Sequence, residues 1–180
     1  MRVLNAANLL TFLRLLATGP VLWAILERRF RLALGVLLLA GVSDALDGPL
    51  ARRCGSTTRL GAYLDPVADK LLMSGSYVAM ALVGVAPRWL VVLILGRDVL
   101  ILTVAAVALL FTSRREFRPS VWGKLSTVVQ VITGVTLLTA AGCPWPPLGR
   151  VAGWLIWVAA VATVWSGFDY ARQTITRPRN

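Results

Sequence analysis

Long apolar runs alternate with short polar segments along the chain, and six such runs stand out. They are Leu9–Leu26, Leu32–Val42, Leu60–Val85, Trp89–Phe111, Val121–Ala140 and Val151–Val164. Most approach the roughly 20 apolar residues that a helix needs to cross a bilayer. The second run is short if it stops before the first aspartate, so we expect that helix to continue through Asp44 and Asp47. The pattern predicts an all-α integral membrane protein in which residues 1–180 form a single domain of six transmembrane helices.

The composition supports the membrane assignment and limits the chemistry. Hydrophobic residues make up 57% of the 180 residues, above the roughly 45–50% of an ordinary soluble domain. The first apolar run is too long for a typical signal-peptide core, so we expect it to remain as a helix of the protein. The chain has no histidine, which removes the commonest general base and zinc ligand. Any acid–base chemistry therefore falls to carboxylates.

The basic residues predict the topology. Lysine and arginine outnumber aspartate and glutamate by 19 to 8, which raises the possibility of nucleic-acid binding. With six spans both termini share one side, and ten loop and tail arginines fall on that side against five on the other. By the positive-inside rule both termini are cytoplasmic, and the charge suits anionic headgroups rather than nucleic acid. Cys54 and Cys143 then lie on opposite sides, so we expect two free thiols.

Four carboxylates, Asp44, Asp47, Asp65 and Asp69, border or interrupt the apolar runs. An ionised carboxylate at the centre of a bilayer helix costs about 2.5–3.5 kcal/mol, so a cluster needs compensation. Residues three or four apart share a helix face, and the polar connection between the two pairs predicts antiparallel neighbouring helices. The resulting cluster at the cytoplasmic mouth suits Mg²⁺ or Mn²⁺, and two such ions can hold a diphosphate.

Small and basic residues accompany the carboxylates. Gly48 and Gly61 remove side chains where a substrate would approach the backbone, and Ala51 keeps the same helix face small. Arg52 offers a planar fork for phosphate oxygens. Taken one by one, these residues have an alternative explanation, because glycines ease helix packing in membranes and arginines at helix ends reach headgroups.

The combined spacing resembles the signature of the CDP-alcohol phosphotransferases, DxxDGxxAR followed after eight residues by GxxxDxxxD, at every fixed position. This resemblance implies a six-helix membrane enzyme, often a homodimer, that transfers a substituted phosphate from a CDP-linked donor to an alcohol and releases CMP. It implies that Asp44, Asp47 and Asp65 hold the metals. Asp69 would be the catalytic base and would also contact a metal. The donor site would be lined by Gly48, Ala51, Arg52 and Gly61.

Further segments resemble the branch of this family that makes phosphatidylglycerol phosphate or cardiolipin from CDP-diacylglycerol. They are Asn8–Arg14, Leu64–Lys70, Gly96–Asp98 and Gly123–Gln130. Arg97 and Lys124 are cations in or beside apolar runs, and such residues are functional candidates. We expect them to bind the phosphate of glycerol 3-phosphate, although Arg97 could instead pair with Asp98 or with an aspartate of the cluster.

Position 126 bears on the choice of acceptor. Phosphatidylglycerophosphate synthases often carry a lysine where this chain has Ser126. One cation fewer weakens the case for a small phosphorylated acceptor, so phosphatidylglycerol, as in a cardiolipin synthase, is the alternative to glycerol 3-phosphate. The sequence favours glycerol 3-phosphate narrowly.

Two other classes of protein remain as alternatives. A metal-ion transporter could use the same aspartates as an ion site, but transporters tend to repeat their halves, and here all four acids lie in two consecutive helices. A structural membrane protein would use the seven tryptophans as interfacial anchors. Neither alternative accounts for the spacing of the carboxylates.

Overall fold

The computed structural model describes residues 6–53, 59–111, 121–143 and 145–176, and its regular secondary structure within these ranges is helical. The helices are α1 (Ala6–Leu26), α2 (Phe30–Arg53), α3 (Arg59–Leu82), α4 (Arg88–Phe111), α5 (Val121–Gly142) and α6 (Pro146–Thr176). Each contains one of the six predicted apolar runs, or nearly all of it. The predicted all-α class is confirmed for this part of the chain.

Two helices show how far apolar patterning determines helix length. Helix α2 continues past the apolar run through Asp44 and Asp47 to Arg53, as predicted. Helix α6 is longer than its apolar run at both ends, with 31 residues. It starts at Pro146, because proline fits the first helical position, where its missing N–H has no partner to lose. An apolar run thus marks the centre of such a helix and not its ends.

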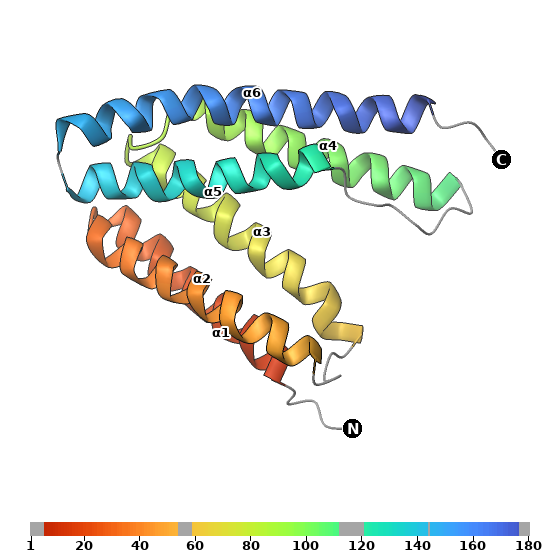
Figure 1. The fold of residues 1–180 in the computed structure, drawn as a ribbon, viewed down its shortest axis with the longest axis horizontal. Helices are drawn as coiled ribbons and strands as arrows, with labels where there is room; N and C mark the ends of the chain where they lie inside the picture. Colours follow the sequence, from red (N-terminus) through yellow and green to blue (C-terminus); the bar gives the residue numbers. More distant parts are fainter. Residues whose placement is uncertain (1–5, 54–58, 112–120, 144, 177–180) are drawn as a thin grey trace. The chain divides into compact units, whose positions relative to one another are not determined.

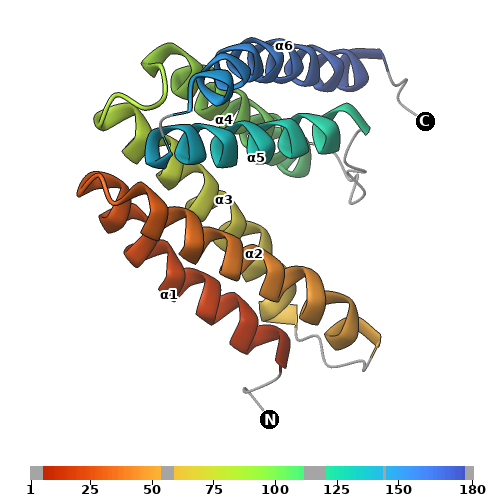
Figure 2. The ribbon, with the colours of Figure 1, turned by 60° about the vertical axis from the view of Figure 1, so that its left-hand side comes forward.

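The described chain forms two compact units. The first unit comprises residues 1–86 and 141–143, and the second comprises residues 87–140 and 144–180. In the first unit α1 packs against both α2 and α3, and the three helices alternate in direction (Figures 1 and 2). Its core includes Val21, Ile25, Leu72, Tyr77 and Met80, all nearly inaccessible to solvent. The end of α2 and the start of α3 therefore lie at the same end of this unit.

The second unit contains α4, α6 and all but the end of α5. Helix α4 packs against α6, and the Trp89 and Trp157 rings meet with their centroids 5.3 Å apart. Between α5 and α6, Gln130 Nε2 donates to Thr163 Oγ1 at 3.0 Å. Such side-chain hydrogen bonds join helices where water is excluded.

The surfaces of both units carry many exposed apolar side chains. Leu39 is 71% exposed, Val92 70% and Trp154 75%, which is unfavourable in water and favourable in lipid. Helix α5 and residues Pro146–Tyr170 of α6 are long and apolar enough to cross a membrane, and Arg14–Leu26 and Phe30–Val42 are shorter apolar segments. These findings fit a membrane protein, while the six spans and the single domain stay predictions.

Candidate active site

The four predicted metal-binding aspartates lie at one end of the first unit. Asp44 and Asp47 are in the second half of α2, and Asp65 and Asp69 are in the first half of α3. Because α2 and α3 run in opposite directions, these segments share the end of the unit at which α1 begins (Figures 1 and 2). The spacing of three and four residues keeps each pair on one helix face. The side chains of Asp44, Asp47 and Asp65 lie outside the described residues.

Asp69 is the member of the cluster whose side chain is described, and it forms an ion pair. Arg14 Nη1, from α1, donates to Asp69 Oδ1. The Arg14 side chain is 6% exposed, whereas that of Asp69 is 58% exposed. One oxygen of the carboxylate is thus held by a buried guanidinium, while the carboxyl group as a whole stays accessible. This arrangement orients Asp69 and leaves it able to meet a substrate.

Arg14 was not among the predicted site residues. It is a cation within the apolar run Leu9–Leu26, and the same rule that singled out Arg97 applies to it, because ionisable residues within membrane helices mark functional sites. Its partner could not be predicted, since Asp69 is 55 residues away along the chain and the contact depends on how α1 packs against α3. The buried cation was the available signal.

The predicted donor-site residues lie close to the carboxylates along α2 and α3. Gly48, Ala51 and Arg52 lie in α2 beyond Asp47, and Gly61 lies in the first turn of α3. Helix α2 runs through Pro49 to Arg53. The side chains of Ala51 and Arg52 lie outside the described residues, so their contact with a donor stays a prediction.

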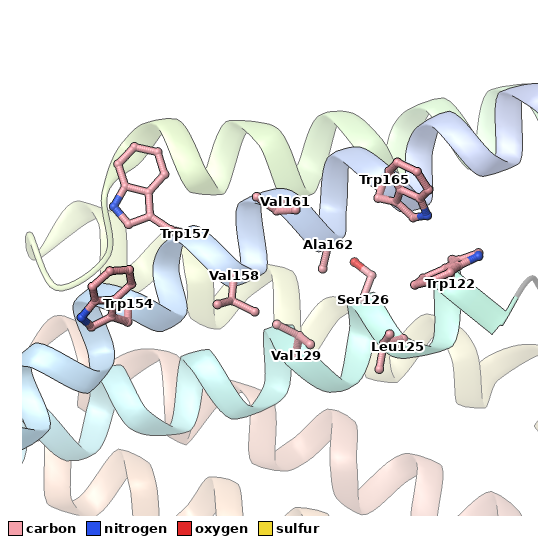
Figure 3. A pocket seen from close by; sticks show the side chains of 10 residues that line it. All are labelled: Trp122, Leu125, Ser126, Val129, Trp154, Trp157, Val158, Val161, Ala162 and Trp165. Atoms are coloured by element: carbon pink, nitrogen blue, oxygen red, sulfur yellow. The ribbon is translucent and has the colours of Figure 1, made fainter.

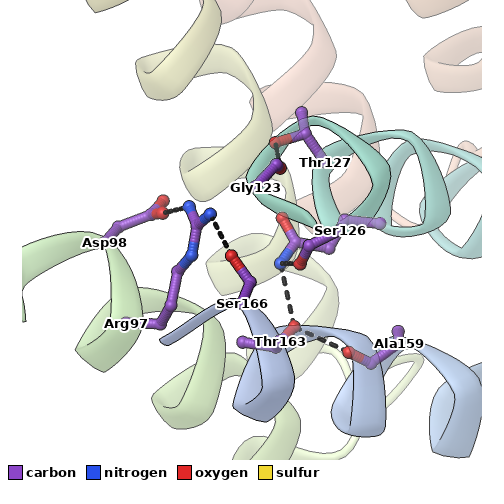
Figure 4. A network of polar contacts seen from close by, with 9 residues as sticks. Arg97, Asp98, Gly123, Ser126, Thr127, Ala159, Thr163 and Ser166 are labelled. Carbon is purple, nitrogen blue, oxygen red and sulfur yellow. Dashed lines mark hydrogen bonds and ion pairs between the residues drawn. The ribbon is translucent and has the colours of Figure 1, made fainter. Parts of the chain in front are cut away.

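Arg97, a predicted acceptor-binding residue, lies in the second unit within a polar network (Figure 4). Its Nη1 donates to Asp98 Oδ1 at 2.8 Å, and its Nη2 donates to Ser166 Oγ of α6 at 2.7 Å. The side chains of Arg97 and Asp98 are only 10% and 11% exposed. The ion pair that the sequence left as an alternative is present. Arg97 Nε is buried without a hydrogen-bond partner among the described residues.

Lys124 and Ser126 lie near the start of α5 in very different surroundings. Lys124 is exposed, whereas Ser126 is 1% exposed. Gln130 Nε2 lies 3.4 Å from Ser126 Oγ and also donates to Thr163 (Figure 4). Lys124 is therefore free to meet a soluble anion, whereas the serine side chain is enclosed among polar groups of the helix pair.

The second unit also has an apolar groove between α5 and α6, with a volume of about 560 Å³. Figure 3 shows Trp154 and Trp157 at one end of this groove and Trp122 and Trp165 at the other. Between them the lining is aliphatic except for Ser126. Such a surface can accommodate hydrocarbon but offers no ionisable group for catalysis.

The donor chemistry of the carboxylate cluster fits a divalent cation. Four aspartates supply the oxygen ligands that Mg²⁺ and Mn²⁺ prefer. Among the side chains that the structure describes, no three acidic or cysteine side chains gather in one place. Three of the four predicted ligands lie outside that part, so the metal prediction is not tested by the coordinates. Cys143 is a free thiol, as predicted, and Cys54 lies outside the described residues.

Residues 4–165 match the CDP-alcohol phosphatidyltransferase family. The chain belongs to this family. Members of the family are membrane-embedded and generally depend on a divalent metal. The match includes all eight fixed positions of the motif and both helices that carry the carboxylates.

Curated relatives of this CDP-alcohol phosphatidyltransferase fall into the two predicted activities. A probable phosphatidylglycerophosphate synthase of Mycobacterium tuberculosis is 35% identical over 97% of this chain and 83% of its own length. A CDP-diacylglycerol–glycerol-3-phosphate 3-phosphatidyltransferase of Sodalis glossinidius is 39% identical over 75% of this chain and 74% of its own length. A cardiolipin synthase (CMP-forming) of Streptomyces coelicolor is 34% identical, with 85% and 74% covered. No solved structure matches the chain.

Proposed function

We propose that this protein transfers the phosphatidyl group of CDP-diacylglycerol to glycerol 3-phosphate, forming phosphatidylglycerol phosphate and releasing CMP. One observation carries the proposal above all: relatives named for this reaction resemble most of the chain, including the region of the carboxylate motif. The family membership also removes the basis for a metal-ion transporter or a purely structural protein.

In the proposed reaction a hydroxyl oxygen of glycerol 3-phosphate attacks the phosphorus that bears the diacylglycerol. The new P–O bond forms as the P–O bond to CMP breaks, and the hydroxyl proton passes to Asp69. Its exposed carboxylate can reach a substrate, as a general base must. Arg14 acts as a positioning residue, because its guanidinium holds Asp69 Oδ1.

The donor and the metal would share the end of the first unit at which α2 ends and α3 begins. Asp44, Asp47 and Asp65, with Asp69, would hold two Mg²⁺ or Mn²⁺ ions, which supply charge neutralisation at the diphosphate. Gly48, Ala51, Arg52 and Gly61 would line the space for the cytidine diphosphate. The glycines let the donor approach the backbone, and Arg52 offers a bidentate contact to phosphate.

Lys124 and Arg97 are the residues proposed to bind the acceptor. Lys124 is exposed and would meet the phosphate of glycerol 3-phosphate as a point charge. Arg97 is largely neutralised by Asp98 and bonded to Ser166, so we assign Lys124 the larger share of acceptor binding.

Cardiolipin synthesis is the second candidate function. Ser126, which stands where phosphatidylglycerophosphate synthases often carry a lysine, is enclosed and neutral. A cardiolipin synthase is also among the relatives. Phosphatidylglycerol would then be the acceptor, and it would reach the site from the bilayer.

The remaining parts of the proposal concern the membrane. We propose six spans, with both termini and the active site on the cytoplasmic side, from the distribution of arginines. A homodimer is the assembly that the family resemblance suggests, and chemical cross-linking in native membranes would test it. Cysteine-accessibility labelling at Cys143, on the predicted outer side and exposed, would test the orientation.

The first experiment is CMP release by the purified protein in detergent with CDP-diacylglycerol and Mg²⁺. Glycerol 3-phosphate, phosphatidylglycerol and inositol phosphate are compared as acceptors, with Asp69→Asn as the inactive control. We expect release with glycerol 3-phosphate. Release with phosphatidylglycerol alone would make the protein a cardiolipin synthase, and release with neither, in protein that binds CDP-diacylglycerol, would overturn the acceptor assignment.

A further inference from the structure

The first unit has a second polar feature, at the end opposite the carboxylates, where α1 connects to α2. A hollow of about 400 Å³ opens there. We call it the arginine hollow, and it is lined by Arg28, Arg29, Phe30, Arg31, Leu32, Ala141 and Gly142. Its three arginines are exposed, and the predicted reaction gives them no role.

The backbone of the connection is closely defined. Arg28 has a φ of 57°, in the left-handed region that few side chains other than glycine adopt. Its N–H donates to the Ile25 carbonyl at 3.0 Å, and the N–H of Arg29 donates to the Ala24 carbonyl at 2.8 Å. The Arg29 guanidinium lies 5.0 Å from the centroid of the Trp23 ring. The turn thus ends α1 and starts α2 within a few residues and presents successive arginines at the same end of the unit.

The opposite wall of the hollow is the backbone at Gly142. Arg31 Nε donates to the Gly142 carbonyl at 2.9 Å. A Cβ at position 142 would lie 3.2 Å from Arg31 Cγ and 3.4 Å from Phe30 Cβ, so glycine permits this close approach. The hydrogen bond fixes the guanidinium by its Nε, and its two Nη nitrogens have no hydrogen-bond partner among the described residues.

The charge of the hollow is uncompensated by its own lining, which contains three guanidinium groups and no carboxylate. Glu27 is exposed in the adjoining turn but does not line the hollow. The start of α2 also borders the hollow, and there the first backbone N–H groups and the helix dipole favour an anion. A pre-ordered guanidinium fork matches phosphate oxygens well.

We propose that the arginine hollow binds the phosphate of an anionic phospholipid. Its flanks favour a lipid over free phosphate, because Trp23 and Leu32 beside it are each 48% exposed and would meet the start of the acyl chains. Tryptophan and arginine are typical of the level of the headgroups. The site is separate from the proposed base, since it lies where α1 connects to α2, whereas Asp69 pairs with Arg14 in the first half of α1.

Native mass spectrometry of the full chain, released from detergent, tests the proposal by counting retained phosphatidylglycerol against phosphatidylcholine. The test variant is Arg28→Gln/Arg31→Gln. The matched control is Arg88→Gln/Arg150→Gln, which removes two exposed arginines predicted on the same membrane side. We expect the test variant to weaken phosphatidylglycerol retention by about 10–30-fold, from the loss of charge-assisted hydrogen bonds to the phosphate. The control should change it by less than about twofold, because its arginines do not line the hollow.

Three results would overturn the proposal. Equal losses in both variants would mean a general effect of surface charge, and equal losses of both lipids would mean a packing defect. Displacement of the lipid by inorganic phosphate at millimolar concentration would make the ligand a free phosphate. If Arg31→Gln disturbs folding through Gly142, Arg28→Gln alone serves, and it should still lower retention severalfold without changing the melting temperature.

Discussion

Two arginine–aspartate pairs, one in each unit, differ in how much of the carboxylate they leave exposed. In the pair of Arg14 and Asp69 the cation is buried and the acid is 58% exposed, whereas in the pair of Arg97 and Asp98 both partners are about 10% exposed. When both charges are buried, breaking the ion pair costs much free energy, because it leaves a buried charge without a partner. Burial of the cation alone fixes the acid and keeps it accessible. The difference supports the proposed role of Asp69 as a base, whereas Arg97 joins α4 to α6 through its hydrogen bond to Ser166.

The largest effect is expected from removing the charge of the accessible acid. Asp69→Asn should lower kcat by about 10³-fold, the usual contribution of a general base. Folding should be retained, because asparagine is of similar size and its amide oxygen can still accept from Arg14. Loss of the carboxylate beside this buried guanidinium should nevertheless lower Tm. CMP release measures the activity, and binding of CDP-diacylglycerol measures the retained fold. Activity like that of the unmodified protein would remove Asp69 from the role of base.

The corresponding change in the buried pair of Arg97 and Asp98 should affect stability instead. Asp98→Asn leaves Arg97 buried without an opposite charge, which costs about 3 kcal/mol and lowers Tm by about 6–12 °C. The double variant Arg97→Met/Asp98→Leu should recover most of the loss, since it removes both charges. Thermal unfolding in detergent provides the measurement. A large loss of kcat at unchanged Tm would instead place Arg97 in the catalytic machinery.

A smaller effect on kcat is expected from replacing Arg14, the buried partner of Asp69. Arg14→Gln should lower kcat by about 10–100-fold with little change in the KM for CDP-diacylglycerol, because the orientation of Asp69 is lost but the donor site remains. Arg14→Lys should recover part of the rate. In the double variant with Asp69→Asn the two effects should not add, as for residues that act together. Additive effects would separate Arg14 from Asp69.

The smallest effect is expected at the exposed lysine. Lys124→Ala should raise the KM for glycerol 3-phosphate about tenfold and leave the KM for CDP-diacylglycerol unchanged, because it removes one charge contact to phosphate. Arg88→Gln, another exposed cation of the second unit, is the control and should change neither. An equal rise in both KM values would place Lys124 away from the acceptor.

The sequence predicted the helices better than the ion pairs between arginine and aspartate. Long apolar runs located the six helices of the described residues, and the need for sufficient length predicted that α2 continues through its aspartates. The ends of α6 were missed, because polar residues such as Arg172 prolong a helix without an apolar signal. Arg97 and Asp98 are adjacent in the chain, so their pairing could be anticipated. The contact between Arg14 and Asp69 could not, since it depends on the packing of helices that are distant in sequence.

The length of α6 also relates the protein to the thickness of its membrane. At 1.5 Å per residue its apolar part, the 25 residues Pro146–Tyr170, measures about 38 Å, against a hydrocarbon core of about 30 Å. A span of this length tilts, or its last turns emerge beyond the lipid tails. A change of a few ångströms in acyl-chain length would then alter the tilt of α6, and with it the position of Ser166 relative to the bilayer. Bilayers of graded thickness would reveal this sensitivity as an optimum in turnover.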